Sequence, residues 1–302
     1  MRKIYTLTVL LIIASTLISA CGAAKTAAPT DLLAQIKQRG TILVSTDPNY
    51  EPQSFLNTNG KRPSDTKCPS DTLTSAEMQG FDVSVAVEVG KRLGVETCFA
   101  TPEWDMITAG NWADKWDISV GSMTIYVSRQ KVLWFTTPYY YTPAVIATRT
   151  DSGINTVEDL AGKAICAATA TTYEDWLNGK IATNLPASSI YAQPPAGITV
   201  VTLPTDQECA QSLNSGRKDF VAYVTSETVV NANIAAGMPM KTVGKPVYSE
   251  DLAIAIDKAH TLPTDTLLKA VDDIVIAMHT DGTLSQLSTK WFGSDLTQDP
   301  NK

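Results

Sequence analysis

The sequence predicts an α/β fold with mostly parallel sheets, because short β-branched runs alternate with stretches of helical periodicity along most of the chain. With 302 residues, the chain is long enough for about two domains of ordinary size. The runs expected to form strands are residues 41–45, 117–120, 144–147, 163–167, 198–203, 219–224 and 252–256.

Helices are expected where apolar residues recur every three or four positions. The first stripe precedes the stop signal Gly94 and consists of Val83, Ala86, Val87, Gly90 and Leu93. The second precedes Asp281 and Gly282 and consists of Leu267, Val271, Ile274, Val275 and Met278. A last short helix is expected from Leu284, Leu287 and Trp291.

Between these elements, residues 57–79 form a polar insertion rich in Pro, Ser and Thr, and they predict a surface loop that contains Cys68.

The composition excludes several classes of function. The 24 Lys and Arg residues against 31 Asp and Glu residues give a net charge of −7, so nucleic acid is not an expected partner. The sequence has no P-loop and no dinucleotide fingerprint, and Thr124 stands where a nucleophile elbow needs Gly. With two His and no His/Cys cluster, we expect no metal site and no cofactor. His260 and His279 are expected at the surface or at helix ends rather than in a catalytic triad.

Residues 1–20 predict a signal peptide, with Arg2 and Lys3 before an uncharged apolar run. The run ends in the letters LISAC at 17–21, which resemble the lipobox of bacterial lipoproteins. That resemblance implies cleavage before Cys21, lipidation of Cys21 and anchoring to the outer face of a membrane, with residues 21–30 as a tether. Ordinary secretory cleavage after Ala20 and a retained membrane helix are the alternatives.

Several motifs between about Gly40 and Gly293 occur together in one known family. They are TDPNYEP at 46–52, GFDV at 80–83, SMTI at 122–125 followed by Arg129, FTTPYY at 135–140, and KWFG at 290–293. In these motifs the chain resembles the family 3 extracellular solute-binding proteins, which are the polar amino-acid receptors of bacterial ABC importers.

The resemblance implies a periplasmic-binding-protein-like fold of two α/β lobes joined by two crossing segments. The first lobe would comprise residues 31–143 with 250–302, and the second lobe residues 144–249. The hinges would lie at 141–146 and 247–252, and closure about them would hold a small carboxylate-bearing solute in the cleft. The expected partners of this monomeric receptor are that ligand, the membrane subunits of an ABC permease, and the membrane that holds the lipid on Cys21.

Besides Cys21, the chain has four cysteines, an even number that suggests two disulfides in an exported protein. Three pairings are possible. The lobe division implied by the resemblance favours Cys68 with Cys98 and Cys166 with Cys209, because each pair then falls inside one lobe. Buried free thiols are the alternative.

The expected centre of the site is Arg129, because a guanidinium binds a carboxylate through two parallel hydrogen bonds. Its motif implies that it takes the ligand carboxylate, and loss of its side chain should weaken binding at least about tenfold. The resemblance also places Ser122, Met123 and Thr124 in the site. Ser122 and Thr124 would offer backbone and hydroxyl groups, or would only cap the following turn.

Two aromatic residues, Tyr50 and Trp104, match positions that sandwich the ligand in this family, and packing in the lobe core is their alternative role. Asp47 matches a position that contacts the ligand side chain in some members, or it caps the turn at Pro48.

In the second lobe, the resemblance places Thr169, Thr171 and Thr172 at a strand-to-helix turn that is directed at the carboxylate. Thr171 or Thr172 is also a candidate N-cap. The glycine that is usual in this turn is absent from residues 168–172.

The chain departs from the family at the residue that usually binds the α-ammonium. Val224, beside the predicted site residue Tyr223, stands where many members carry Asp. Either Glu227 or Asp47 holds the amine, or the ligand lacks a primary α-amine. The resemblance as a whole predicts a receptor and not an enzyme. An exported enzyme similar to cyclohexadienyl dehydratase, with Asp47 or Glu227 as general acid, is the alternative.

Overall fold

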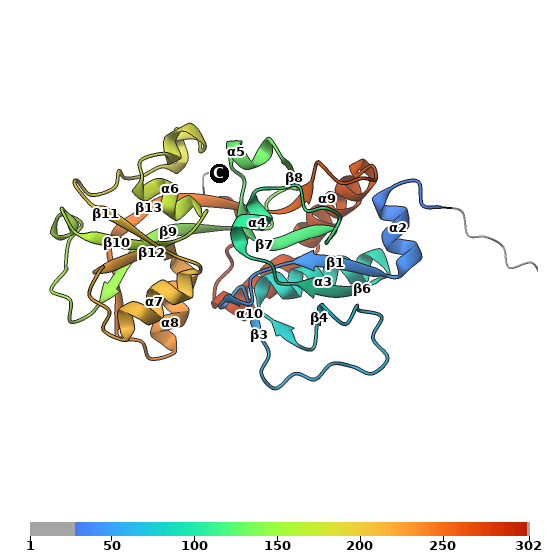
Figure 1. Ribbon diagram of the computed structural model, residues 1–302, viewed down its shortest axis with the longest axis horizontal. Coiled ribbons are helices and arrows are strands. Elements are labelled where there is room, and N and C mark those ends of the chain that lie inside the picture. The colour runs from blue at the N-terminus through green and yellow to red at the C-terminus, as the bar shows by residue number, and fades with distance from the viewer. Residues whose placement is uncertain (1–27, 301–302) are drawn as a thin grey trace, which may run out of the picture.

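The computed structural model describes residues 28–300. The predicted signal peptide, Cys21 and most of the predicted tether lie outside these residues. Figure 1 shows two lobes side by side, with long strands running between them. We call them the β1 lobe, which contains β1, β6, β7, α2, α3, α9 and α10, and the β10 lobe, which contains β10, β11, β12, α6, α7 and α8.

The elements from the start of the described chain to the first long strand are α2 (Leu32–Arg39), β1 (Thr41–Ser45), β2 (Asn49–Tyr50), β3 (Ser54–Leu56), β4 (Leu73–Thr74), β5 (Met78–Gln79), α3 (Phe81–Leu93), β6 (Glu96–Ala100), α4 (Trp104–Thr108), β7 (Ile118–Thr124), α5 (Val127–Gln130), β8 (Leu133–Phe135) and β9 (Tyr140–Arg149). The remaining elements are η1 (Glu158–Leu160), β10 (Ala164–Ala168), α6 (Thr172–Leu177), η2 (Ile181–Thr183), η3 (Ala187–Ser189), β11 (Thr199–Leu203), α7 (Asp206–Asn214), β12 (Ala222–Ser226), α8 (Glu227–Ala235), β13 (Met240–Asp257), α9 (Asp265–Thr280) and α10 (Thr283–Phe292).

Each lobe has a parallel core, as predicted. β1 pairs in parallel with β6 and β7, and β10 pairs in parallel with β11 and β12. The whole sheet runs in the order β11-β10-β12-β9-β13-β7-β1-β6-β4, and the pairs that involve β9 and β13 are antiparallel. The sheet is therefore mixed, with parallel strands in each lobe and antiparallel strands where the lobes join.

The junction consists of β9 and β13, which pair with each other along most of their length. The prediction covered only residues 144–147 and 252–256 of these strands. The rest of β13 escapes prediction because its polar residues lack a strand pattern, while residues 240–243 and 248–252 are held in the strand by pairing with β9. Their register shifts between Val243 and Tyr248, so the junction is irregular close to the second predicted hinge.

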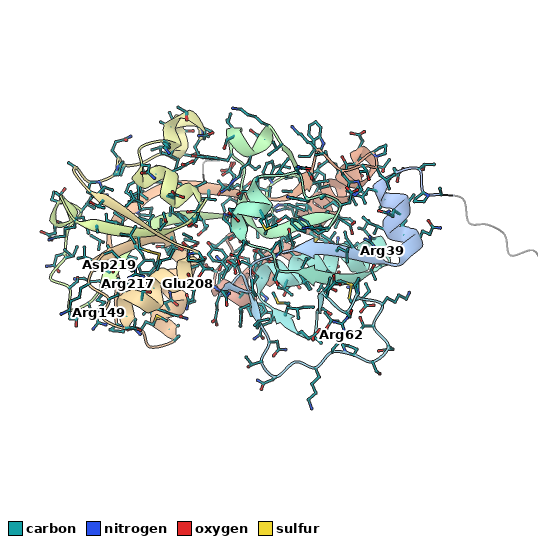
Figure 2. All side chains as sticks on the ribbon, in the orientation of Figure 1. Arg39, Arg62, Arg149, Glu208, Arg217 and Asp219 are labelled. Atoms are coloured by element: carbon teal, nitrogen blue, oxygen red, sulfur yellow. A yellow bond between two sulfur atoms is a disulfide. The ribbon has the colours of Figure 1, made fainter. Side chains whose placement is uncertain are left out.

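In the β1 lobe, α3, α9 and α10 cover the core. Of the predicted apolar stripe of α3, Val83, Ala86 and Gly90 are buried, and Val87 and Leu93 are partly buried against the core. Gly94 ends the helix in a left-handed conformation with φ 76°, as expected of a C-terminal glycine. α9 ends at Thr280, just before the predicted stop at Asp281. At the other end of this lobe, Arg39 of α2, labelled in Figure 2, lies close to the start of the described chain. It pairs with the buried carboxylate of Asp117 beside β7.

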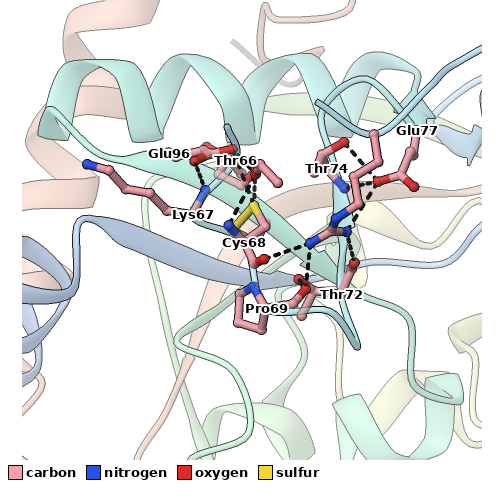
Figure 3. Close-up of polar contacts among 11 residues, drawn as sticks. Thr66, Lys67, Cys68, Pro69, Thr72, Thr74, Glu77 and Glu96 are labelled. Atoms are coloured by element: carbon pink, nitrogen blue, oxygen red, sulfur yellow. Dashed lines mark hydrogen bonds and ion pairs between the residues drawn. A yellow bond between two sulfur atoms is a disulfide. The ribbon is translucent and has the colours of Figure 1, made fainter. Parts of the chain in front are cut away.

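The insertion at residues 57–79 is more ordered than the predicted surface loop. Arg62 donates to the backbone oxygens of Cys68 at 2.6 Å and Thr72 at 2.7 Å. Figure 3 shows the same region: Glu96 of β6 accepts the backbone N–H of Lys67 at 2.8 Å and the hydroxyl of Thr66. The segment is thus fixed to β6 by polar contacts that its composition alone does not indicate.

The structure confirms both predicted disulfides. Cys68 pairs with Cys98 across a Cα–Cα distance of 5.4 Å and ties the insertion to β6. Cys166 pairs with Cys209 across 5.9 Å and ties β10 to α7. Within residues 28–300, no helix combines the length and apolar character that crossing a membrane requires.

Candidate ligand-binding site

A cavity lies between the lobes, where β1, β7 and β10 end. It contains about 440 Å³ that protein atoms do not fill, including the part continuous with solvent. Eight predicted site residues line it: Asp47, Tyr50, Trp104, Ser122, Thr124, Arg129, Thr171 and Thr172.

The single Arg in the cavity lining, Arg129, is 6% exposed on the short helix α5. Its guanidinium carbon lies 5.5 Å from the ring centre of Trp104 and 5.6 Å from that of Tyr126. Two hydrogen bonds fix its orientation, from Nη1 to the Thr124 oxygen at 3.3 Å and from Nη2 to the Ala170 oxygen at 3.1 Å. The second bond joins the two lobes.

The charge of Arg129 has no ion-pair partner among the described residues. Burial lowers the pKa of Arg129, and the nearby carboxylate of Glu250 acts in the opposite direction. A guanidinium remains protonated in proteins, so this site contains a buried cation that a ligand carboxylate could pair with.

Glu250 of β13 is 2% exposed and lines the same cavity. It accepts the hydroxyls of Thr124 at 2.7 Å, Thr172 at 2.8 Å and Tyr173 at 2.8 Å. Thr124 belongs to the β1 lobe and the other two donors to α6, so this carboxylate links both lobes. Burial raises the pKa of Glu250, and its hydroxyl donors partly offset that rise.

Two more carboxylates, Asp47 and Asp206, line the cavity. Burial raises the pKa of Asp47 to about 6, partly offset by the backbone N–H of Asn49, which donates to Oδ1 at 2.7 Å. Asp47 therefore caps its turn and also faces the cavity. Asp206 is 5% exposed, and its Oδ1 has no hydrogen-bond partner. Burial, with Asp47 and Glu250 nearby, raises the pKa of Asp206 well above its usual range.

Ser122 is held in a strained conformation, because its φ of 53° lies in the left-handed region that favours glycine. Its hydroxyl donates to the buried Asp82 at 2.7 Å. The hydroxyl of Tyr139 donates to the same carboxylate at 2.7 Å and accepts the Ser122 N–H at 2.9 Å. Burial raises the pKa of Asp82 to about 7. This network fixes the backbone beside the cavity and is not a cap of the following turn.

On the β10 lobe, Thr171 and Thr172 were each predicted as a ligand-binding residue or an N-cap, and the structure gives them different roles. Thr171 is the N-cap of α6, because its hydroxyl accepts the Glu174 N–H at 3.2 Å. Thr172 instead donates to Glu250. Ala170 takes the place of the missing glycine and adopts a φ of 60°, which directs its oxygen toward Arg129.

Three predicted site residues do not line the cavity. Met123 points to the opposite face of β7 from Ser122 and Thr124, since strand side chains alternate, and it packs with Trp112 and Leu133. Thr169 is exposed, and its hydroxyl donates to the Leu203 oxygen at 3.2 Å.

The third, Tyr223, is buried against Cys166 and Cys209. Its neighbour Val224 belongs to the core on the other face of β12, and Glu227 does not line the cavity either. Of the two residues offered for amine binding, only Asp47 is in place. His279 lies in the last turn of α9, as expected, and neither it nor His260 lines the cavity.

The residues missed from the sequence include Tyr173, Asp206 and Glu250. The position of Asp206 could have been predicted, because Thr205 and Glu208 have the spacing of a capping box directly after a predicted strand. That spacing indicates a helix whose first turn contains Asp206. The structure confirms this cap, with the Glu208 N–H donating to the Thr205 hydroxyl at 3.1 Å. Glu250 lies in a predicted hinge segment, where nothing local indicates that three hydroxyls meet its carboxylate.

The cavity thus combines a buried cation with several carboxylates and two aromatic rings, which suits a small solute carrying both charges. Within residues 28–300, no cluster of His, Cys, Asp and Glu has the arrangement of a metal site.

Comparison with known proteins agrees with this geometry. The sequence model of the bacterial extracellular solute-binding proteins, family 3, matches residues 42–294. The L-cystine-binding protein TcyJ of Escherichia coli strain K12 is 29% identical over 276 residues, which cover 91% of each chain. Similar curated proteins are named as binding proteins for cystine, arginine and histidine.

Solved structures give the same fold. A mutant of ArgBP from T. maritima superposes with a TM-score of 0.69 at 26% identity, covering 87% of this chain and 99% of that chain. An ancestral amino acid-binding protein described as a precursor of cyclohexadienyl dehydratase superposes with a TM-score of 0.68 at 28% identity, covering 86% and 99%. These similarities confirm the predicted two-lobe α/β fold.

Proposed function

The chain belongs to the bacterial extracellular solute-binding proteins, family 3, and from this premise we propose that it captures an amino acid between its lobes and delivers it to the permease of an ABC importer. The observation that carries the proposal is the state of Arg129. It is buried between two aromatic rings, lines the cavity and has no carboxylate partner in the described part of the chain. A ligand carboxylate would supply that partner.

In this proposal, Arg129 meets the carboxylate through two parallel hydrogen bonds, which contribute about 1.5–3 kcal/mol each. Trp104 and Tyr50 line the cavity and supply flat apolar surface against the body of the ligand. The cavity carboxylates bind the ammonium in place of the Asp that Val224 replaces.

Ligand binding would favour the closed arrangement, because only this arrangement brings the groups of both lobes to the ligand together. Three contacts support this part of the proposal: Arg129 to Ala170, Thr124 through Glu250 to Thr172, and Tyr50 to Tyr173 at 3.2 Å between hydroxyls. Opening would separate residues 31–143 with 250–302 from residues 144–249. The bending would fall in 141–146 and 247–252, next to the register shift of β13.

Proteins of this family act outside the cytoplasm. The lipobox-like ending of residues 17–21 supports a lipid anchor on Cys21, with 21–30 as a tether to the membrane that holds the permease. Replacing Cys21 by Ala should release the protein from the membrane fraction. Retention of the variant in that fraction would argue against the anchor.

The experiment that tests the binding role is calorimetric titration of the purified protein with each of the common amino acids and with cystine. We expect at least one of them to bind with a Kd in the micromolar range or below, and the same compound to raise the melting temperature by mass action. If none of these compounds binds, the proposal is wrong.

A further inference from the structure

We propose that Asp206 and Asp47 form a cation subsite in the cavity, so that the preferred ligand is an amino acid with a net positive charge. Such a ligand carries one carboxylate for Arg129 and two cationic groups, the α-ammonium and a cationic side chain. This inference rests on the proposed function, because it names the class of amino acid that the same cavity takes.

The first observation is that one oxygen of the buried Asp206 carboxylate lacks a partner, although the backbone N–H of Ala168 and the hydroxyl of Thr225 interact with this carboxylate and lower its pKa. Asp206 lies in the first turn of α7, is 5% exposed and lines the cavity, yet its Oδ1 has no hydrogen-bond partner. The side chain of Thr205 caps the helix, so capping does not employ Asp206. A buried carboxylate oxygen without a partner is costly, and a bound cation would remove that cost.

The second observation is the balance of charge around the cavity. Arg129 is the only cationic side chain in its lining, against the carboxylates of Asp47, Asp206 and Glu250. Glu250 receives only neutral hydroxyls, and no ion pair joins Arg129 to any of the three among the described residues. A zwitterion would add one positive and one negative charge and would leave the excess of carboxylates unchanged.

The surroundings of the two aspartates add negative potential. The charged groups that act on Asp206 are Asp47 and Glu250, and those that act on Asp47 include Glu103 and Glu208. Figure 2 shows Glu208 on the part of α7 nearest the β1 lobe. Burial is the main reason that the pKa values of both aspartates lie above their usual range, and these neighbours add to it. A cation between the carboxylates would favour their ionised forms.

Other classes of amino acid fit the subsite formed by Asp206 and Asp47 less well. An acidic amino acid would place its second carboxylate near carboxylates of the same charge. A neutral amino acid would pair its ammonium with one acid and leave the other buried acid without a cation. A ligand with a cationic side chain supplies two cations for the two aspartates. The side-chain cation ends near Asp206, where the ring of Tyr50 also lines the cavity and can make a cation–π contact.

The test compares L-arginine with L-citrulline by calorimetry on the unaltered protein, because the two have nearly the same shape and differ in the charge of the side-chain terminus. L-lysine and L-glutamine form a second pair. We expect the cationic member of each pair to bind at least about tenfold more tightly. Equal or tighter binding of citrulline and glutamine would overturn the inference and leave the proposed function intact. Failure of every amino acid to bind would overturn the proposed function as well.

The variant Asp206→Asn tests whether Asp206 causes the preference for a cationic ligand. It should weaken arginine binding at least about tenfold and change citrulline binding much less. Asp219→Asn is the matched control, since Asp219 is exposed, pairs with Arg217 and lies on the outer side of the β10 lobe in Figure 2. An unchanged arginine-to-citrulline ratio in a folded Asp206→Asn protein would contradict the assignment. Should that variant not fold, the ratio measured on the unaltered protein still decides.

Discussion

Replacing Arg129 by Met removes the guanidinium and keeps a side chain that can fill much of the space between Trp104 and Tyr126. If Arg129 makes two charge-assisted hydrogen bonds to the ligand carboxylate, their loss costs about 3–6 kcal/mol. That range corresponds to a weakening of about 10²–10⁴-fold. The bond to the Ala170 oxygen is also lost, which removes one of the contacts that hold the lobes together.

The variant Arg129→Lys separates charge from geometry. Lysine keeps a positive charge but lacks the planar fork, so it should recover about half of the lost binding free energy. We therefore expect an affinity between those of the unaltered protein and of Arg129→Met. Arg217→Met is the matched control, because Arg217 is exposed and pairs with the nearby Asp219.

Calorimetry with the tightest-binding amino acid measures all four proteins, and circular dichroism confirms that each variant is folded. The assignment of Arg129 would be refuted if a folded Arg129→Met protein bound within about threefold of the unaltered protein, because that difference amounts to well under one charge-assisted bond.

Three further predictions test other parts of the structure. Asp47, with a pKa of about 6, and Asp206, whose pKa burial also raises, must both lose their protons to hold a cation. Calorimetry should therefore show the affinity for a cationic ligand falling at least about tenfold from pH 8 to pH 5, and a constant affinity would contradict this. Replacing both Cys166 and Cys209 by Ala opens a loop of sequence separation 43 and should lower the free energy of unfolding by about 3–4 kcal/mol. Urea unfolding measures this change, and an unchanged urea midpoint would contradict the prediction. Gly80→Ala should cost roughly 2 kcal/mol or more in the same assay, because φ is 128° and the new Cβ would lie 2.2 Å from the Gln53 oxygen; wild-type stability would show that this contact relaxes freely.

Local patterns were sufficient where one periodicity and one stop signal define an element. The stripe of α3 followed by Gly94 is an example, and the β-branched run of β1 is another. β13 could not be predicted at its full length, because residues 240–243 and 248–252 are held in the strand by pairing with β9, a partner far away in the sequence. The same limit applies to the insertion, whose order depends on Arg62 and Glu96.

The candidate site divides in the same way. Residues inside family motifs, such as Arg129 and Trp104, were predicted and do line the cavity. Met123 was included with its motif although alternation along a strand places it opposite Ser122 and Thr124. Asp206 and Glu250 lie outside the motifs, and their convergence depends on how α7 and β13 meet the cavity.

The role of Arg129 as the carboxylate partner is tested most directly on the unaltered protein, by calorimetric titration with the tightest-binding amino acid and with the amine that results from removing its carboxylate. Loss of two charge-assisted bonds predicts that the amine binds at least about 100-fold more weakly. Binding of the amine within about threefold of the amino acid would contradict the account, because Arg129 would then contribute nothing that depends on a carboxylate.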